Sequence, residues 1–349
     1  MDFRLKMPLR GAAVAASILA ASSASAQEDI STVYSGQSIT VVVGAATGSL
    51  QDRYARVIGR YLIKHVPGSP TIRYRNMPGA SGQKAALWLF STATRDGLTF
   101  SSLTPDVIAG PLLGDEKDKK FDPLKFNFIG SAASPVYICL SRPDAPAASF
   151  SEVRSRRLVM GALKEGGATQ DISYALINLA GARFRIVPHY RDRVELLGAL
   201  EHGEVHGACG FSWSTLRTRW PELLKEKKTV LFLQVALKPR RDLTRLNVPI
   251  VWDFIDSTED RTALELLARA QQVGIPYAAP PRVLRRRVAA LRVAFERTMK
   301  DLEFKAETRK AKLDLSPIYG DDLQRVIEKI YQTPSETVAK ARAARRPGG

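Results

Sequence analysis

Short apolar runs of strand length alternate along the chain with longer segments in which apolar residues recur every three or four positions. The run "ITVVV" at 39–43 precedes such a segment at 50–66, where Tyr54, Ile58 and Leu62 fall on one helical face. The same order recurs further along the chain. Repeated alternation of strands and helices predicts an α/β fold whose sheets are largely parallel.

A second series of the same kind begins near the middle of the chain, with strand-like runs at 157–163 and 184–189. Two such series predict two lobes joined by crossover strands, and we expect the crossings near 128–140 and 231–239. Ligands of open α/β sheets bind at the carboxyl ends of strands, so a ligand cleft is expected between the lobes. The predicted division is 27–132 with 238–349 for the first lobe and 133–237 for the second.

The first 26 residues have the pattern of a cleavable secretory signal peptide. Basic residues open the segment, an apolar stretch at 11–20 follows, and Ala24-Ser25-Ala26 has the form of a cleavage site. The stretch is too short to span a bilayer. The alternative is an amphipathic N-terminal helix of the fold. We expect an exported mature chain that begins near Gln27.

The chain is strongly basic, with a formal net charge of +17, 45% hydrophobic and 25% charged residues. Its basic runs at 282–292 and 339–349 contain no interleaved aromatic residues of the kind that bind single-stranded nucleic acid. We therefore interpret the charge as a solvated surface that attracts anions, and we expect no nucleic-acid partner.

The turn at 44–52, "GAATGSLQD", leads from a predicted strand into a predicted helix. Free backbone N–H groups, the helix dipole and the hydroxyls of Thr47 and Ser49 would favour an anion there. The turn lacks the Gly-Lys-Ser/Thr ending of a phosphate-binding P-loop. The alternative is an ordinary turn in which Ser49 is the N-cap.

A similar turn, "MGALKEGGATQD" at 160–171, follows a strand in the second lobe. Gly166 and Gly167 allow close backbone approach, and Thr169 could cap the next helix and donate its hydroxyl. Two such turns at corresponding places predict a clamp around a small anion, with one helix N-terminus on each side.

The sequence offers little for catalysis or metal binding. His202 and His206 are spaced i, i+4, but Gly203 and Gly207 disfavour the helix that would present both to zinc. No Gly-x-Ser-x-Gly elbow is present, and no pattern ties a histidine to "CGFSWS" at 209–214. We predict that the protein is not an enzyme and that it binds no metal and no cofactor.

Two further residue pairs leave alternatives open. Cys139 and Cys209 are either a disulfide or two buried thiols, because sequence spacing cannot give the distance between them. Phe211 and Trp213 are either a wall of the ligand cleft or part of the core. Ser212 and Trp213 together are candidate wall residues.

Several segments resemble the tripartite tricarboxylate transporter substrate-binding proteins, also called the Bug family. The resemblance begins with the strand, turn and helix at 39–62 and the Asn-x-Pro-Gly-Ala-x-Gly turn at 76–82, which is followed by Arg-Asp-Gly at 95–97. It continues through "GEVHGACGFSWS" at 203–214 and "IYQTPSETVAKAR" at 330–342. It covers nearly the whole chain after residue 27.

The resemblance implies a two-lobed type II periplasmic-binding fold that holds a carboxylate through backbone N–H groups, hydroxyls and ordered water. The family's turn aspartate corresponds to Asp52, and its glycine-rich stretch to Gly48, Ser49 and Leu50. Leu50 departs from the pattern, and the turn must change shape if that position requires a positive φ. Ala208 stands where a larger polar residue is expected in this branch of the family.

We interpret the chain as a periplasmic solute-binding receptor. It would close two lobes on a di- or tricarboxylate or an aromatic acid and deliver this ligand, as a monomer, to the membrane subunits of a secondary transporter. The alternatives are a ligand-sensing partner of a membrane signalling protein and an exported hydrolase. The expected ligand-binding residues are Ala46, Thr47, Gly48, Ser49, Asp52, Gly167, Ala168, Thr169, Ser212 and Trp213.

Overall fold

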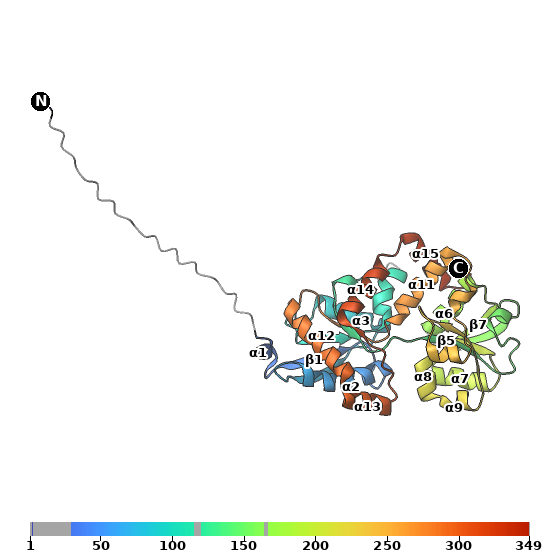
Figure 1. Cartoon of the computed structure of the whole chain (residues 1–349), viewed down its shortest axis with the longest axis horizontal. Coiled ribbons are helices and arrows are strands. Elements are labelled where there is room, and N and C mark those ends of the chain that lie inside the picture. The colour runs from blue at the N-terminus through green and yellow to red at the C-terminus, as the bar shows by residue number, and fades with distance from the viewer. Residues whose placement is uncertain (1, 3–28, 115–119, 164–166, 349) are drawn as a thin grey trace.

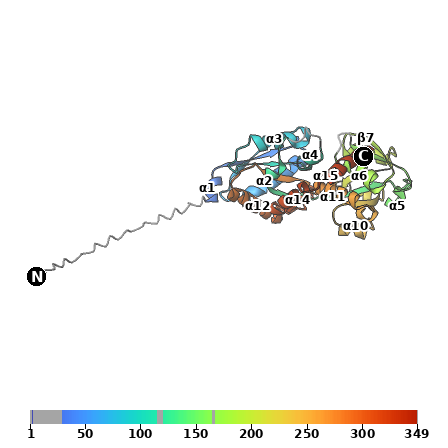
Figure 2. The ribbon, with the colours of Figure 1, turned by 90° about the horizontal axis from the view of Figure 1, so that it is seen from above.

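The computed structural model describes residues 2, 29–114, 120–163 and 167–348, which form two lobes side by side (Figure 1, Figure 2). The predicted signal peptide lies outside the described residues, apart from Asp2. Among the residues that the structure describes, no helix combines the length and apolar character needed to cross a bilayer.

The first lobe is built on a six-stranded sheet with the order β11-β4-β10-β3-β1-β2. Its strands are β1 (Ser38–Val43), β2 (Thr71–Asn76), β3 (Thr99–Ser102), β4 (Asn127–Ser131), β10 (Pro276–Ala279) and β11 (Ile318–Tyr319). Its helices are α1 (Ile30–Tyr34), α2 (Leu50–His65), α3 (Gln83–Ser91), α4 (Pro105–Leu113), α12 (Arg285–Lys300), α13 (Leu302–Lys310) and α14 (Gly320–Tyr331). Helix α2 buries Tyr54, Ile58 and Leu62, the face that the helical spacing predicts.

The second lobe is built on a five-stranded sheet with the order β7-β6-β8-β5-β9. Its strands are β5 (Tyr137–Ser141), β6 (Leu158–Leu163), β7 (Phe184–Tyr190), β8 (Gly207–Ser212) and β9 (Val230–Val235). The helices between them are α5 (Phe150–Val153), α6 (Ala168–Ala180), α7 (Arg193–Glu201), α8 (Trp213–Arg219) and α9 (Pro221–Lys225). Two sheets interleaved with helices confirm the predicted two-lobed α/β fold, but both sheets are mixed and not largely parallel as predicted, because β10 and β11 in the first sheet and β5 in the second run antiparallel to their neighbours.

Strand directions place the carboxyl ends of both sheets at the interface between the lobes. In the first sheet, β1, β2 and β3 are parallel, and β4 shares their direction because β10 is antiparallel to both β3 and β4. The chain leaves β4 at Ser131 and enters the second sheet at Tyr137, so the carboxyl ends of these strands face the second lobe. In the second sheet, β5 is antiparallel to β8 and β9, and β6 is parallel to β7 and β8. The carboxyl ends of β6, β7 and β8 therefore face the first lobe.

The chain crosses between the sheets at 132–136, within the first predicted crossing, but its return differs from the prediction. Gln234 of β9 forms a bridge with Ile250, and Leu243 and Val248, which follow β9, belong to a buried cluster of the second sheet. The segment holds α10 (Arg241–Arg245) and leads into α11 (Thr258–Gln272). The return follows α11, at 273–275, rather than at the predicted 231–239, because the chain first packs on the second sheet. The lobe boundaries at 132/133 and 237/238 stay a prediction.

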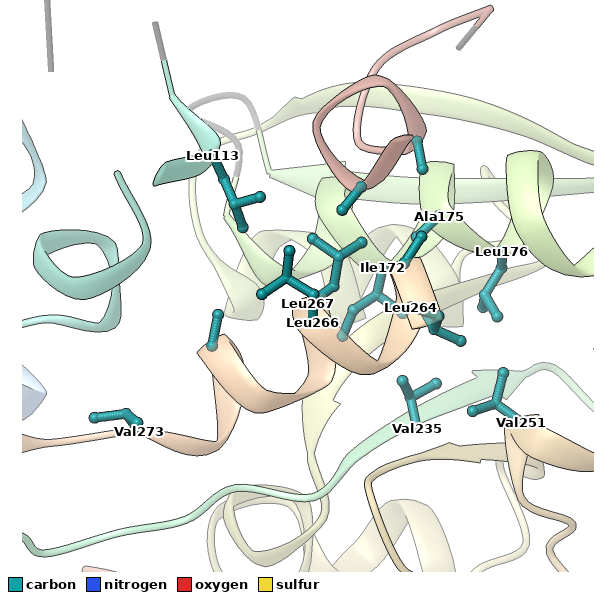
Figure 3. Packing of buried hydrophobic residues seen from close by; sticks show 14 of the residues in the cluster. Leu113, Ile172, Ala175, Leu176, Val235, Val251, Leu264, Leu266, Leu267 and Val273 are labelled. Carbon is teal, nitrogen blue, oxygen red and sulfur yellow. The ribbon is translucent and has the colours of Figure 1, made fainter. Parts of the chain in front are cut away.

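The lobes also share a hydrophobic cluster around α11 and the C-terminal helix α15 (Ser335–Ala344). Figure 3 shows Leu264 and Leu267 of α11 beside Ile172 of α6 and near Leu113 of α4. Helix α15 contacts both α4 and α6. The two lobes are thus joined by packing as well as by the chain crossings.

A disulfide joins Cys139 of β5 to Cys209 of β8. The two residues are register partners in this antiparallel pair, with their Cα atoms 4.0 Å apart. Of the two alternatives left open by the sequence, the structure has the disulfide.

Candidate functional site

The first candidate element is the turn between β1 and α2, which lies at the lobe-facing edge of the first sheet. Ser49 is the N-cap of α2, and its Oγ accepts a hydrogen bond from the N–H of Asp52 at 3.2 Å. Gly48 has a φ of 79°, a left-handed conformation that glycine adopts without strain. The positive φ is therefore at Gly48 and not at Leu50, so Leu50 does not force the turn to change shape.

Asp52 fixes the shape of this turn. Its carboxylate accepts hydrogen bonds from the N–H of Gly48 at 2.8 Å, from Nδ2 of Asn76 at 3.0 Å and from Nε of Arg56 at 2.9 Å. Burial acts to raise the pKa of Asp52, but the hydrogen bonds from Arg56, Gly48 and Asn76 outweigh it and lower the pKa below its usual value. With its oxygens directed to these donors, Asp52 shapes the turn.

Beside the hydrogen bonds of Asp52, the turn has backbone N–H groups without partners among the described residues. Among the described residues, no hydrogen bond uses the N–H groups of Ala46, Thr47, Leu50 or Gln51. Ala46, Thr47 and Gly48 are exposed. Free N–H groups at the positive end of a sixteen-residue helix favour an anion.

The second-lobe turn leads from β6 into α6, and its residues 164–166, including Gly166, lie outside the described part. Gly167, with a φ of 78°, is the N-cap position of α6 and makes no side-chain cap hydrogen bond. The N–H groups of Ala168 and Thr169 have no hydrogen-bond partner among the described residues. A second helix N-terminus thus lies at the lobe-facing edge of the second sheet, where the half-buried Ala168 has an N–H without a partner among the described residues, whereas Thr169 is fully buried.

Thr169 differs from its predicted role as a cap. Its side chain is fully buried inside α6, and its Oγ1 accepts a hydrogen bond from the N–H of Leu163 at 3.1 Å. The strand end of β6 is thereby fixed to the first turn of α6. Gly210 of β8 packs so closely here that a Cβ on it would lie 2.3 Å from the carbonyl oxygen of Ala168.

The proposed wall residues lie at the start of α8. Ser212 is the half-buried N-cap residue, and its hydroxyl lies 3.0 Å from that of Ser214. Trp213 and Phe211 are almost fully buried in the second lobe's core, and Nε1 of Trp213 donates to Asp242 at 2.9 Å. Both aromatic side chains are therefore core residues.

Two further positions from the sequence also have structural roles. Ala208 is buried in β8 opposite Leu140, so a larger polar side chain would not fit there without disturbing the core. Nδ1 of His206 accepts a hydrogen bond from the N–H of Val159 at 3.1 Å, which links β8 to β6. Within the described ranges, no three His, Cys, Asp or Glu side chains gather as metal ligands do.

Three arginines that the sequence did not indicate interact through their charges, one from the first lobe and two from the second. Arg53 is on the first turn of α2, Arg193 begins α7, and Arg219 ends α8. Burial, together with the charges of Arg53 and Arg193, lowers the pKa of Arg219. Nothing in the sequence relates these residues, because they are more than twenty positions apart and share no motif.

A separate cavity of about 230 Å³ lies where the chain crosses between the lobes. Its walls come from α4, α6, α11 and the crossing segments, and include Leu113, Ile172 and Leu264. Asp106 of α4 and Asp171 of α6 line it, and Asp171 forms an ion pair with Arg345 at 2.8 Å. None of the ten predicted ligand-binding residues lines this cavity.

Two lobes joined by crossing segments, with helix N-termini at their facing edges, define the fold of the two-lobed periplasmic binding proteins. The chain is similar to a TctC solute-binding protein from Polaromonas, with 15% identity, a TM-score of 0.68, and coverage of 88% of this chain and 97% of that one. It is also similar to the periplasmic binding protein BugD, with 18% identity, a TM-score of 0.60, and coverage of 88% of this chain and 98% of that one. A third similar structure is MatC from Rhodopseudomonas palustris with bound malate, with 21% identity, a TM-score of 0.58, and coverage of 89% of this chain and 99% of that one.

At these identities the likeness establishes the fold. No protein-family model matches the chain, and no curated protein sequence matches it.

Proposed function

We propose that the chain is a periplasmic solute receptor of the tripartite tricarboxylate transporter type, which captures a small carboxylate between its lobes. The observation that carries this proposal is the pair of helix N-termini at the facing edges of the two sheets. The free N–H groups of Ala46, Thr47, Leu50 and Gln51 would bind the ligand from one side and that of Ala168 from the other.

Binding without chemical change of the ligand follows from the same arrangement. Backbone donors stabilise a carboxylate but supply no nucleophile or general base. Hinge closure would bury the ligand and exclude water from its hydrogen bonds. MatC, which has the same fold, holds malate, a dicarboxylate, and this supports the choice of ligand class.

The partner would be the membrane subunits of a secondary transporter, to which the closed, monomeric receptor delivers its ligand. The membrane-signalling alternative uses the same cleft and differs in the docking partner. Uptake of the identified ligand by cells with and without the gene separates the two, since only a transport receptor supports uptake.

The direct test is a thermal-shift screen of the purified protein against mono-, di- and tricarboxylates, aromatic acids, and neutral and cationic analogues. A ligand that binds only the folded state raises the melting temperature as its concentration rises. We expect at least one carboxylate to do so, with its dissociation constant then measured by calorimetry. A shift from neutral or cationic compounds alone would overturn the proposal.

A further inference from the structure

The cavity of about 230 Å³ at the crossing between the lobes is bounded mainly by apolar side chains. Leu113 of α4 comes from the first lobe, Ile172 of α6 from the second, and Leu264 from α11, the helix before the return crossing (Figure 3). An apolar cavity of about 150 Å³ is large enough to hold a benzene ring. The larger space here therefore has room for such a ring together with a short polar extension.

Two carboxylates line this apolar space, and only one of them has a partner among the described residues. Asp171 of α6 pairs with Arg345 at 2.8 Å. Asp106 of α4 accepts a hydrogen bond from Nε2 of Gln83 at 3.1 Å, but this bond ends on its backbone oxygen. Within the described ranges, no ion pair or hydrogen bond involves the Asp106 carboxylate. One acidic side chain of the cavity wall is therefore available to a ligand.

The neighbours of Asp106 in the cavity do not supply the missing positive charge. Burial raises the pKa of Tyr137 to about 12, with a further contribution from the charges of Asp106 and Asp171, so the tyrosine hydroxyl is neutral. Lys238 also lines the cavity, but it is exposed, and water and salt screen its charge. A cation inside the cavity would compensate a carboxylate that the chain leaves without a partner.

We propose that this cavity binds a small primary amine with an apolar body. The ammonium group pairs with Asp106, and the apolar body lies between α4, α6 and α11. This site is separate from the proposed carboxylate site, because none of the ten predicted ligand-binding residues lines the cavity. Since its walls come from both lobes, the bound amine contacts both.

The chemistry of the walls favours an amine over a neutral or an anionic ligand. A hydrogen bond between an ammonium and a carboxylate is roughly twice as strong as one between neutral groups. The apolar walls exclude water from this pair and thereby strengthen it. An anion would instead meet the like charges of Asp106 and Asp171. The apolar body supplies binding free energy by leaving water.

The test compares benzylamine with benzyl alcohol by calorimetry on the purified protein at neutral pH and constant ionic strength. The two probes have the same ring and the same number of heavy atoms, and only benzylamine is charged. We expect benzylamine to bind at least about tenfold more tightly, because its hydrogen bond to Asp106 is charge-assisted. Equal affinities, or no binding of either probe, would overturn the inference.

A substitution at Asp106 assigns this preference to its carboxylate. We expect Asp106→Asn to weaken benzylamine binding about tenfold or more and to change the affinity for benzyl alcohol much less. Asp253→Asn is the matched control, because Asp253 is exposed, lies outside the cavity and loses the same charge. A preference for benzylamine that survives Asp106→Asn would refute the assignment.

A second substitution tests the position of the apolar body. Ala268 of α11 is half-buried and lines the cavity, so Ala268→Leu narrows it without changing any charge. Both residues favour a helix. We expect both probes to lose most of their affinity, and Ala109→Leu narrows the cavity from α4 if the first variant is unstable. Unchanged benzylamine affinity would place the amine elsewhere. The carboxylate screen succeeds or fails independently, because it concerns other residues.

Discussion

Gly48 and Asp52 show how single residues create the donor-rich turn at the start of α2. The positive φ of Gly48 points its N–H at the Asp52 carboxylate, which leaves the neighbouring N–H groups unbonded. The shape of the turn therefore depends on one glycine with a positive φ and one buried carboxylate.

Gly48→Ala tests this dependence. No atom lies within 4 Å of a Cβ built on Gly48, so the cost of the substitution is backbone strain, about 1 kcal/mol, and not a clash. We expect a lower melting temperature and weaker binding of the carboxylate found in the screen. Gly198→Ala is the control, because this position also has open space but lies inside α7, where alanine stabilises a helix by about 0.5–1 kcal/mol. Equal ligand affinity in both variants would place the site elsewhere.

The pKa of Asp106 in α4 is raised, whereas the pKa of Asp52 is lowered. Burial and the charge of Asp171 raise the pKa of Asp106, and Arg345 opposes them only partly. Because the folded-state pKa lies above the unfolded value, the folded protein loses stability as the pH rises through that interval and this carboxyl ionises.

Asp106→Asn is therefore expected to raise the melting temperature at neutral pH. The gain would shrink towards zero below about pH 3, where the aspartate is mostly protonated in both folded and unfolded states. Thermal denaturation of both proteins across this pH range measures the difference, and about 1 kcal/mol corresponds to roughly 1–2 °C for a protein of this length. A lower melting temperature of the variant at pH 7 would contradict the assignment.

At the scale of elements, the disulfide joins β5 to β8 in the centre of the second sheet. It closes a loop across a sequence separation of 70 residues. A cross-link of this loop length restricts the unfolded chain and stabilises the folded state by about 4 kcal/mol in the chain-entropy model.

We expect Cys139→Ala/Cys209→Ala to unfold at lower denaturant concentration than the oxidised protein. The wild-type protein in reducing agent should show the same loss, because both remove the cross-link and leave the sheet pairing. Equilibrium denaturation in urea provides the comparison. Unchanged midpoints in both cases would show that the disulfide does not contribute to stability.

The helices and strands were predictable where a local pattern determines them, and the site was predictable only in part. The face of α2 and the N-cap at Ser49 follow from spacing and side-chain chemistry close in sequence. The buried hydroxyl of Thr169 could not be inferred, because its partner Leu163 belongs to the end of another element. The charge interaction of Arg53, Arg193 and Arg219 was also missed, since these residues belong to three different helices.

At the scale of the whole molecule, α15 and the two residues after it form hydrogen bonds to both lobes. Arg345 donates to Asp171 of the second lobe and, at 3.5 Å, to the carbonyl oxygen of Leu113 of the first. Nδ2 of Asn178 donates to the carbonyl oxygens of Ala344 and Arg346, both at 3.0 Å. The last helix therefore limits how the lobes move relative to each other.

Arg345→Met should destabilise the protein by about 3 kcal/mol, because it leaves the largely buried carboxylate of Asp171 without its partner. The double variant Arg345→Met/Asp171→Asn should recover most of this loss, since neither charge then remains. Denaturation of both variants gives the two free energies of unfolding. Equal destabilisation in the single and double variants would show that the ion pair is not the cause.

The order of strands along the chain determines which part of the molecule can form first during synthesis. Every strand of the second sheet lies between Tyr137 and Val235, whereas the first sheet takes β10 and β11 from residues 276–319. A growing chain can therefore complete the second sheet while the first still lacks β10, the strand that lies between β3 and β4. The lobe that begins the sequence is thus the last to be finished, and α15 can join the two only when the C-terminus has emerged.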